Sequence, residues 1–165
     1  MKNIPVTSAL ILLCATFAFA ADPAEGFWLS VDDKTGEIQS GWEIYQEDGI
    51  LYGKILSALT LSAADIAARC REGYANFPVA VKVNTLPVLG TPWIFGLRME
   101  NPGSWTGGNV INPSNGNMYR CSIIHHPADG RRYPQEALEM RGQLLIFSGS
   151  QYWRRATREE ASSLR

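Results

Sequence analysis

Short runs of alternating apolar and polar residues, separated by turn residues, make up most of this chain. Trp42 and Ile44 fall on one face of such a run and Glu43 on the other, which is the period-2 pattern of a half-buried strand. The Asp-Gly pair at 48–49 then predicts a hairpin, and an apolar run at 50–56 returns. Alternation of this kind predicts antiparallel β-structure.

The same pattern recurs to the end of the chain. Trp93, Phe95 and Leu97 share one face, and residues 105–124 run in and out around a turn at 113–116. About eight short strands follow one another through mostly tight turns, with neither a repeat nor a linker between them. Sequential hairpins favour an up-and-down antiparallel barrel, lipocalin-like in type, as a single domain.

One long insertion, from Ile55 to Pro92, interrupts the strands. It contains a Ser-x-x-Asp sequence from Ser62, a variant of the capping box, followed by small residues with good helix propensity. This predicts a short helix from about Ala63 to Arg71. The expected fold is therefore an all-β barrel of about eight strands with one short helix in the insertion.

The first twenty residues have the pattern of a secretory signal peptide. Lys2 is followed by an apolar run and by Ala18-Phe19-Ala20, a small-x-small cleavage site. This predicts removal of residues 1–20, a mature domain of residues 21–165, and a periplasmic or secreted location. The apolar run is shorter than the roughly 20 residues of a spanning helix, and no later stretch is long and apolar enough to span a membrane. An uncleaved anchor is the alternative.

Charge excludes one class of partner. The formal charge is −1 and becomes −2 without Lys2, and no run of basic residues occurs. The chain therefore has no evident electrostatic reason to bind nucleic acid or anionic lipid.

Two cysteines remain after signal cleavage, Cys70 and Cys121. In an oxidising compartment an even pair predicts a disulfide bond. The alternative is two buried free thiols, because the sequence does not give the distance between the two Cα atoms. The spacing fits no zinc or redox motif.

No group of residues has the pattern of a catalytic or metal site. The neighbouring side chains of His125 and His126 point in opposite directions on an extended segment, so they do not easily share a metal. Ser148 and Ser150 lack the Gly-x-Ser-x-Gly frame of a nucleophile elbow. We therefore expect no catalytic residue, no metal and no cofactor, and an enzyme is the least favoured class.

The two ends of the mature chain resemble those of lipocalin and calycin barrels. Gly26 and Trp28 form a Gly-x-Trp opener, and Trp153 and Arg155 form a Trp-x-Arg closer. The resemblance implies that Trp28 lies at the closed end of the barrel beneath Arg155. A guanidinium over an indole contributes a cation–π energy of about 0.5–2 kcal/mol. Arg154, which points the other way, should be exposed.

A wider resemblance covers nearly the whole mature chain. The segments GFWLS, EIYQEDGILYGKIL, LPVLGTPWIFGLR, TGGNVINPSNGNMYRC and QYWRRA are similar to the bacterial family called domain of unknown function 2147. Asn112 stands where that family usually has an aspartate. The resemblance implies a secreted or periplasmic calycin-like barrel and no particular activity.

Five side chains fall on the faces assigned to the barrel interior: Trp42, Trp93, Phe95, Tyr119 and Met140. They predict either a filled core or the lining of a cavity for one small ligand. The alternation of side chains between the two faces does not distinguish these alternatives. The favoured function is binding of a small hydrophobic or amphipathic ligand. The alternative is an envelope interaction or structural module with a filled core. In a hollow barrel we expect the opening opposite Trp28, with the insertion as a lid.

Overall fold

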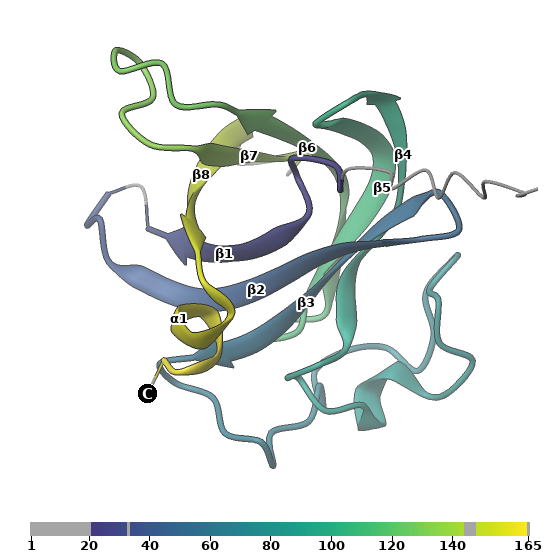
Figure 1. The fold of residues 1–165 in the computed structure, drawn as a ribbon. Helices are drawn as coiled ribbons and strands as arrows, with labels where there is room; N and C mark the ends of the chain where they lie inside the picture. Colours follow the sequence, from purple (N-terminus) through teal and green to yellow (C-terminus); the bar gives the residue numbers. More distant parts are fainter. Residues whose placement is uncertain (1–20, 33, 144–147, 165) are drawn as a thin grey trace, which may run out of the picture.

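The computed structural model describes residues 21–32, 34–143 and 148–164 and shows a closed antiparallel barrel (Figure 1). Each strand pairs with the next one in sequence, and β8 pairs with β1 to close the ring. The predicted eight-stranded up-and-down barrel is confirmed, whereas the predicted signal peptide lies outside the described residues. In chain order the elements are β1 (Gly26–Val31), β2 (Ile38–Glu47), β3 (Ile50–Ala58), the 3₁₀-helix η1 (Val83–Thr85), β4 (Pro92–Asn101), β5 (Ser104–Asn112), β6 (Asn117–His126), β7 (Ala137–Gln143), β8 (Ser148–Ala156) and the helix α1 (Arg158–Ser162).

The hairpin of β2 and β3 shows how local sequence fixes the pairing register. Asp48 and Gly49 have φ angles of 50° and 76°, the left-handed pair that a two-residue hairpin turn requires. This register pairs Ile44 with Gly53 inside the barrel. A Cβ at Gly53 would lie 2.7 Å from the Cδ1 atom of Ile44 and 2.9 Å from that of Ile94. Only glycine therefore lets these two side chains meet in the interior.

The short helix predicted over Ala63–Arg71 is wrong. The segment forms turns, and its backbone pairs with a later part of the insertion. The Ala67 amide donates to the Leu86 carbonyl at 2.9 Å, and the Val88 amide donates to the Asp65 carbonyl at 2.8 Å. These bonds satisfy backbone groups that a helix would have paired locally, so tertiary pairing overrides helix propensity.

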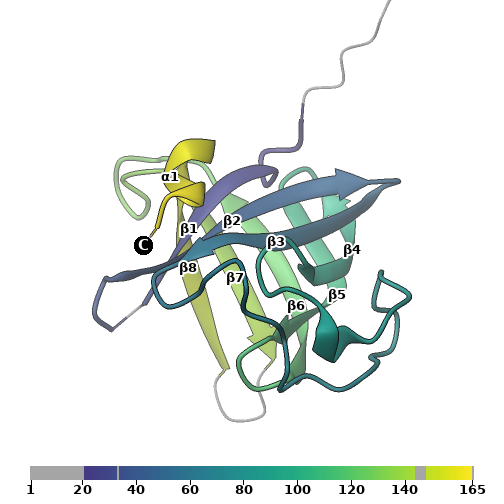
Figure 2. The ribbon, with the colours of Figure 1, turned by 90° about the horizontal axis from the view of Figure 1, so that it is seen from below.

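The α-helix of the described residues, α1, lies instead near the C-terminus, on the outside of β1–β3 (Figure 2). Thr157 and Glu160 form its capping box. The Ser57 hydroxyl donates to the Ala161 carbonyl at 2.8 Å, and a Cβ at Gly41 would collide with the Ala161 backbone. Gly41 thus allows the helix to lie directly on the sheet.

Trp28 and Arg155 form the centre of a plug at one end of the barrel. The two residues are paired between β1 and β8, and Trp28 is fully buried. The guanidinium carbon of Arg155 lies 4.2 Å from the centre of the Trp28 ring, so the contact predicted from the two ends of the chain is present. Arg154 is exposed on the opposite face. Gly26 has a φ of 123°, and a Cβ there would lie 2.7 Å from Nη1 of Arg155.

The segment before β1 completes the plug. Arg155 donates from Nη1 to the Glu25 carbonyl at 2.7 Å and from Nη2 to the Pro23 carbonyl at 3.0 Å. The buried Asp22 carboxylate accepts from the Trp105 indole at 3.0 Å and from the Gly103 amide at 2.8 Å. The first residues of the predicted mature chain therefore bind to both β8 and the β4–β5 turn.

The predicted Cys70–Cys121 disulfide is wrong, because both cysteines are buried free thiols. Cys121 faces the barrel interior, where its thiol lies 3.1 Å from the Met140 sulfur. Cys70 belongs to the insertion and lies outside the wall, beside Gly116 of the β5–β6 turn. Cys121 therefore points into the lumen from β6, whereas Cys70 lies beside the turn that precedes this strand, and the two thiols do not meet.

We expect Arg155→Lys to destabilise the barrel by about 2–4 kcal/mol in urea unfolding. A lysine ammonium replaces neither the paired guanidinium hydrogen bonds nor the flat contact with the indole. Arg154→Lys is the matched control one position away, and its exposed side chain should change stability by less than about 0.5 kcal/mol. Equal effects of the two substitutions would contradict the plug.

The free thiols have a direct chemical test. Residues 21–165, denatured without a reductant, should react with two equivalents of a thiol reagent. The folded protein should react far more slowly, since burial raises the pKa of Cys121 to about 12 and reactivity requires the thiolate. Fewer than two reactive thiols in the denatured chain would contradict this assignment and support the disulfide bond.

Candidate functional site

Side chains inside the barrel become less buried with distance from the plug. On β7, Leu138 lies nearer the plug than Met140. On β6, Ile123 lies nearer the plug than Cys121. Fully buried interior side chains, at 0% exposure, include Trp28, Leu51, Leu97, Trp105, Ile123 and Leu138. Those with residual exposure are Trp42 and Met140 at 7%, Ile55 at 5%, and Cys121 and Trp153 at 4%. Solvent thus reaches the interior from the side away from the plug.

We call this region the unplugged half of the lumen. Its inward-facing residues, assigned by strand register, include Ser30, Ser40, Trp42, Ile55, Gly108, Val110, Tyr119, Cys121, Met140, Gly142, Gln151 and Trp153. Gly142 pairs with Cys121, and a Cβ added to it would meet no atom of the described residues within 4 Å. Among the described residues, the wall therefore borders open space at this position.

The aromatic centre of the unplugged half is a pair of tryptophans. The rings of Trp42 and Trp153 lie 4.9 Å apart with their planes inclined by 31°. Each indole N–H has a local partner, because Trp42 donates to the Ser40 hydroxyl at 2.7 Å and Trp153 to the Gln151 side-chain oxygen at 3.3 Å. The two ring systems are held in place by polar groups of their own strands.

Trp93 and Phe95 lie on the outer face of the barrel, although the sequence pattern assigned them to the interior. Ile94 pairs with Gly53 and faces inward, so Phe95 faces outward. Phe77 of the insertion lies with its ring centre 6.0 Å from that of Trp93 and 5.3 Å from that of Phe95. Gly96, with a φ of 76°, lies where the β3–β4 register shifts, which returns the next apolar side chain to the interior.

The structure therefore divides the five predicted lining residues between two faces. Trp42, Tyr119 and Met140 face the lumen, whereas the other two form an outer core beneath the insertion. The insertion lies outside the ring of strands (Figure 1). It reaches the β5–β6 turn, where the Tyr74 hydroxyl donates to the Gly116 carbonyl at 2.7 Å.

Sequence reasoning missed several lumen residues that were readable from the plug. On β8, Gln151, Trp153 and Arg155 are every second residue and so share one face of the strand. An inward Arg155 therefore places Gln151 and Trp153 in the lumen. Ser30 follows Trp28 on β1 by the same rule, and its hydroxyl oxygen lies 2.6 Å from that of Ser40. The signal in the sequence was that these residues lie an even number of positions from Trp28 or Arg155 on the same strand.

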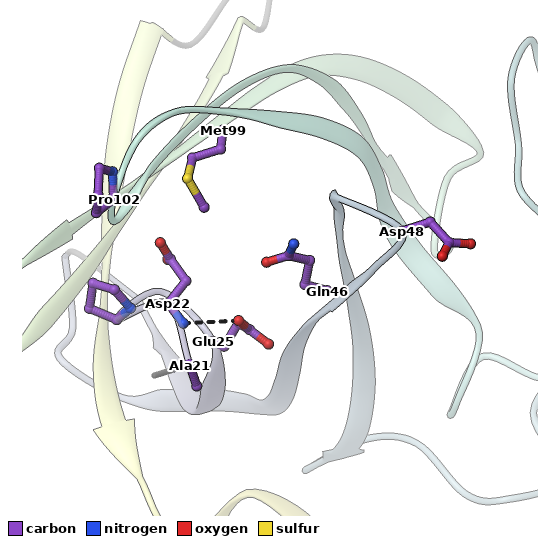
Figure 3. A pocket seen from close by; sticks show the side chains of 8 residues that line it. Ala21, Asp22, Glu25, Gln46, Asp48, Met99 and Pro102 are labelled. Atoms are coloured by element: carbon purple, nitrogen blue, oxygen red, sulfur yellow. Dashed lines mark hydrogen bonds between the residues drawn. The ribbon is translucent and has the colours of Figure 1, made fainter. Parts of the chain in front are cut away.

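A separate pocket of about 710 Å³ lies at the plugged end (Figure 3). Its lining is Ala21, Asp22, Pro23, Glu25, Gln46, Asp48, Met99 and Pro102. The Asp22 and Glu25 carboxylates already accept hydrogen bonds within the N-terminal segment, including the Asp22 amide to Glu25 at 3.0 Å. Their engagement in the plug argues for a structural role rather than a ligand role.

A buried carboxylate lies on the outer face of β6–β8. Glu139, at 3% exposure, accepts from Arg141 Nε at 2.7 Å, from the Ser150 hydroxyl, and contacts His126 Nε2 at 2.7 Å. Burial opposes its ionisation, but these hydrogen bonds outweigh burial and lower its pKa to about 2. Tyr133 stacks on His126 with ring centres 4.3 Å apart. Both carboxylate oxygens are occupied, so Glu139 anchors the strands rather than serving as a free base.

Within residues 21–32, 34–143 and 148–164, no three His, Cys, Asp or Glu side chains gather as metal ligands. The helices described there are all too short or too polar to cross a bilayer.

Comparison with known proteins agrees with this architecture. The sequence profile of a family described as "Uncharacterized protein conserved in bacteria (DUF2147)" matches residues 26–155, from the start of β1 almost to the end of β8. A similar solved structure is described as "Protein HP1028 from the human pathogen Helicobacter pylori belongs to the lipocalin family". It aligns with a TM-score of 0.61 and 17% identity over 83% of this chain and 85% of that one. This likeness shows a lipocalin-like fold. No curated protein matches the sequence.

The low pKa of Glu139 predicts an acid-sensitive contribution to stability. Its folded-state pKa lies below the ordinary value of 4.5, so the contribution is complete above pH 4.5 and is lost as the pH falls toward 2. Glu139→Gln should cost about 2–4 kcal/mol at pH 7, because it leaves Arg141 and His126 without a carboxylate. The difference from the unsubstituted protein should shrink between pH 4.5 and 2.

Urea unfolding at several pH values measures this effect. Glu43→Gln is the control, since it removes an ion pair with Lys54 at the more exposed surface, where the loss should be within about 1 kcal/mol. A Glu139→Gln cost that does not change with pH would contradict the assignment.

Proposed function

We propose that this chain, which belongs to the bacterial family DUF2147, is a periplasmic or secreted barrel protein that binds a small hydrophobic or amphipathic molecule in the unplugged half of its lumen. The observation that carries the proposal is the gradient of burial inside the barrel. A core built only for stability would be packed to the same density at both ends. Here full burial is confined to the plugged end and to the central wall.

The chemistry of the unplugged half supports the same function. Trp42, Trp153, Ile55 and Met140 offer apolar surface to a ligand, and each Å² of it removed from water contributes about 25 cal/mol. Ligand sites in proteins combine such surface with a few polar groups that set orientation. Gln151 and Tyr119 are groups of that kind.

The predicted location is supported by the position of the plug. Asp22, two residues after the predicted cleavage site, is already buried in the barrel. A mature chain that begins at Ala21 would keep Asp22 and its hydrogen bonds within the plug.

The alternative function, an envelope interaction or structural module, is favoured by a different observation. Leu59, Ile66 and Val81 of the insertion are each more than half exposed. Exposed apolar side chains on one segment are typical of contact surfaces when they form a patch. A filled lumen together with a contact surface would describe such a module.

Binding of N-phenyl-1-naphthylamine, a neutral fluorescent probe, tests the ligand proposal. The folded protein should bind it saturably with a rise in probe fluorescence. Gly142→Leu should weaken binding at least about tenfold, because its side chain would project into the lumen from a position where a Cβ meets no described neighbour.

Gly73→Leu is the matched control. Gly73 also has open space around its Cβ position, but it lies in the insertion, outside the barrel. This variant should bind the probe as the unsubstituted protein does. The ligand proposal fails if the folded protein binds no probe saturably, or if both variants bind unchanged.

A further inference from the structure

Among the described residues, no charged side chain faces into the unplugged half. Its inward-facing residues are apolar or carry hydroxyl, amide or thiol groups, and the thiol of Cys121 stays protonated because burial raises its pKa to about 12. Arg155, the cation on the same face of β8, is engaged at the plug. It donates to the Glu25 and Pro23 carbonyls and to a Glu136 carboxylate oxygen at 2.8 Å. No cation is therefore available to neutralise an anion in the unplugged half.

Two hydrogen-bond donors face this region without a partner among the described residues. The Gln151 side-chain oxygen accepts from the Trp153 indole, which fixes the orientation of the amide and leaves its NH₂ group unpaired. Tyr119 faces the same space, and its hydroxyl makes no hydrogen bond with any residue in the described parts of the chain. Neutral donors without partners match an acceptor oxygen on a ligand.

We infer that the unplugged half takes an uncharged amphipathic molecule whose buried end carries a hydroxyl or carbonyl oxygen, and that it discriminates against the carboxylate of the same chain length. This inference rests on the proposed function and specifies the ligand class of that site. The apolar body packs against Trp42, Trp153 and Met140, and the oxygen accepts from Gln151 or Tyr119. A carboxylate placed there would lose its hydration and meet no cation, which makes its burial far more costly than that of a neutral oxygen.

Competition between 1-dodecanol and dodecanoate at pH 8 tests the inference, with N-phenyl-1-naphthylamine as the bound probe. Dodecanol should displace the probe from the unsubstituted protein at a concentration at least about tenfold lower than dodecanoate. Because the alcohol is also the less soluble compound, the decisive readout is the change of this ratio in variants.

Gln151→Lys places a cation beside the bound group and should shift the ratio toward dodecanoate by at least about tenfold. Gln151→Leu removes the donor and should weaken dodecanol displacement while leaving the probe bound. Gln39→Leu is the control, since Gln39 lies exposed on the outward face of β2 and should keep the ratio of the unsubstituted protein. Circular dichroism of each variant verifies that the barrel is folded.

The outcomes separate the inference from the function beneath it. Absence of saturable probe binding overturns the proposed function, and the inference falls with it. Probe binding with equal or better displacement by dodecanoate overturns the inference alone. A ratio that does not move in Gln151→Lys, in a folded protein, also overturns it, because the ligand end then lies away from Gln151.

Discussion

The contact between Arg155 and Trp28 is the constraint on which the architecture depends. It joins the last strand to the first, and the same guanidinium holds the backbone of the segment before β1 at Glu25 and Pro23. Gly26 is required because a side chain there would occupy the space of the guanidinium. Closing one end in this way makes the barrel asymmetric. At the plugged end the lumen is closed by Trp28 and Arg155, and the pocket there lies outside this plug. The proposed ligand space within the lumen therefore lies toward the other end.

The parts of the fold that depend on short-range rules were predictable. Alternation predicted the strands, and the Asp48–Gly49 turn predicted a hairpin. The contact of Trp28 with Arg155 was predicted from the resemblance of the two chain ends to lipocalin and calycin barrels. The same alternation failed in β4, where a bulge at Gly96 exchanges the two faces of the strand. Assigning faces by strict alternation assumes a strand without a β-bulge. A glycine inside a strand indicates in the sequence that a bulge can interrupt the alternation.

The remaining errors come from contacts that join distant parts of the chain. The small residues around Ala67 favour a helix locally, yet pairing with Leu86 supplies their hydrogen bonds from outside the segment. Cys70 and Cys121 are an even pair in sequence, but one belongs to a segment outside the wall and the other faces inside it. The path of the insertion around the barrel decides both outcomes, and composition and spacing contain no information about that path.

The distribution of charge connects the fold to the ligand it suits. The buried Glu139 carboxylate and the half-buried Arg155 guanidinium each have several hydrogen-bond partners, and they lie outside the lumen or at the plug. The described residues that face the interior near Trp42 and Gln151 are all neutral. Affinity in such a site comes from apolar burial, which is tolerant of shape, whereas an unpaired charge is strongly rejected. The proposed site should therefore be selective for the charge state of a ligand before it is selective for chain length or ring structure, because its described residues offer two neutral hydrogen-bond donors, on Gln151 and Tyr119, and no counter-ion.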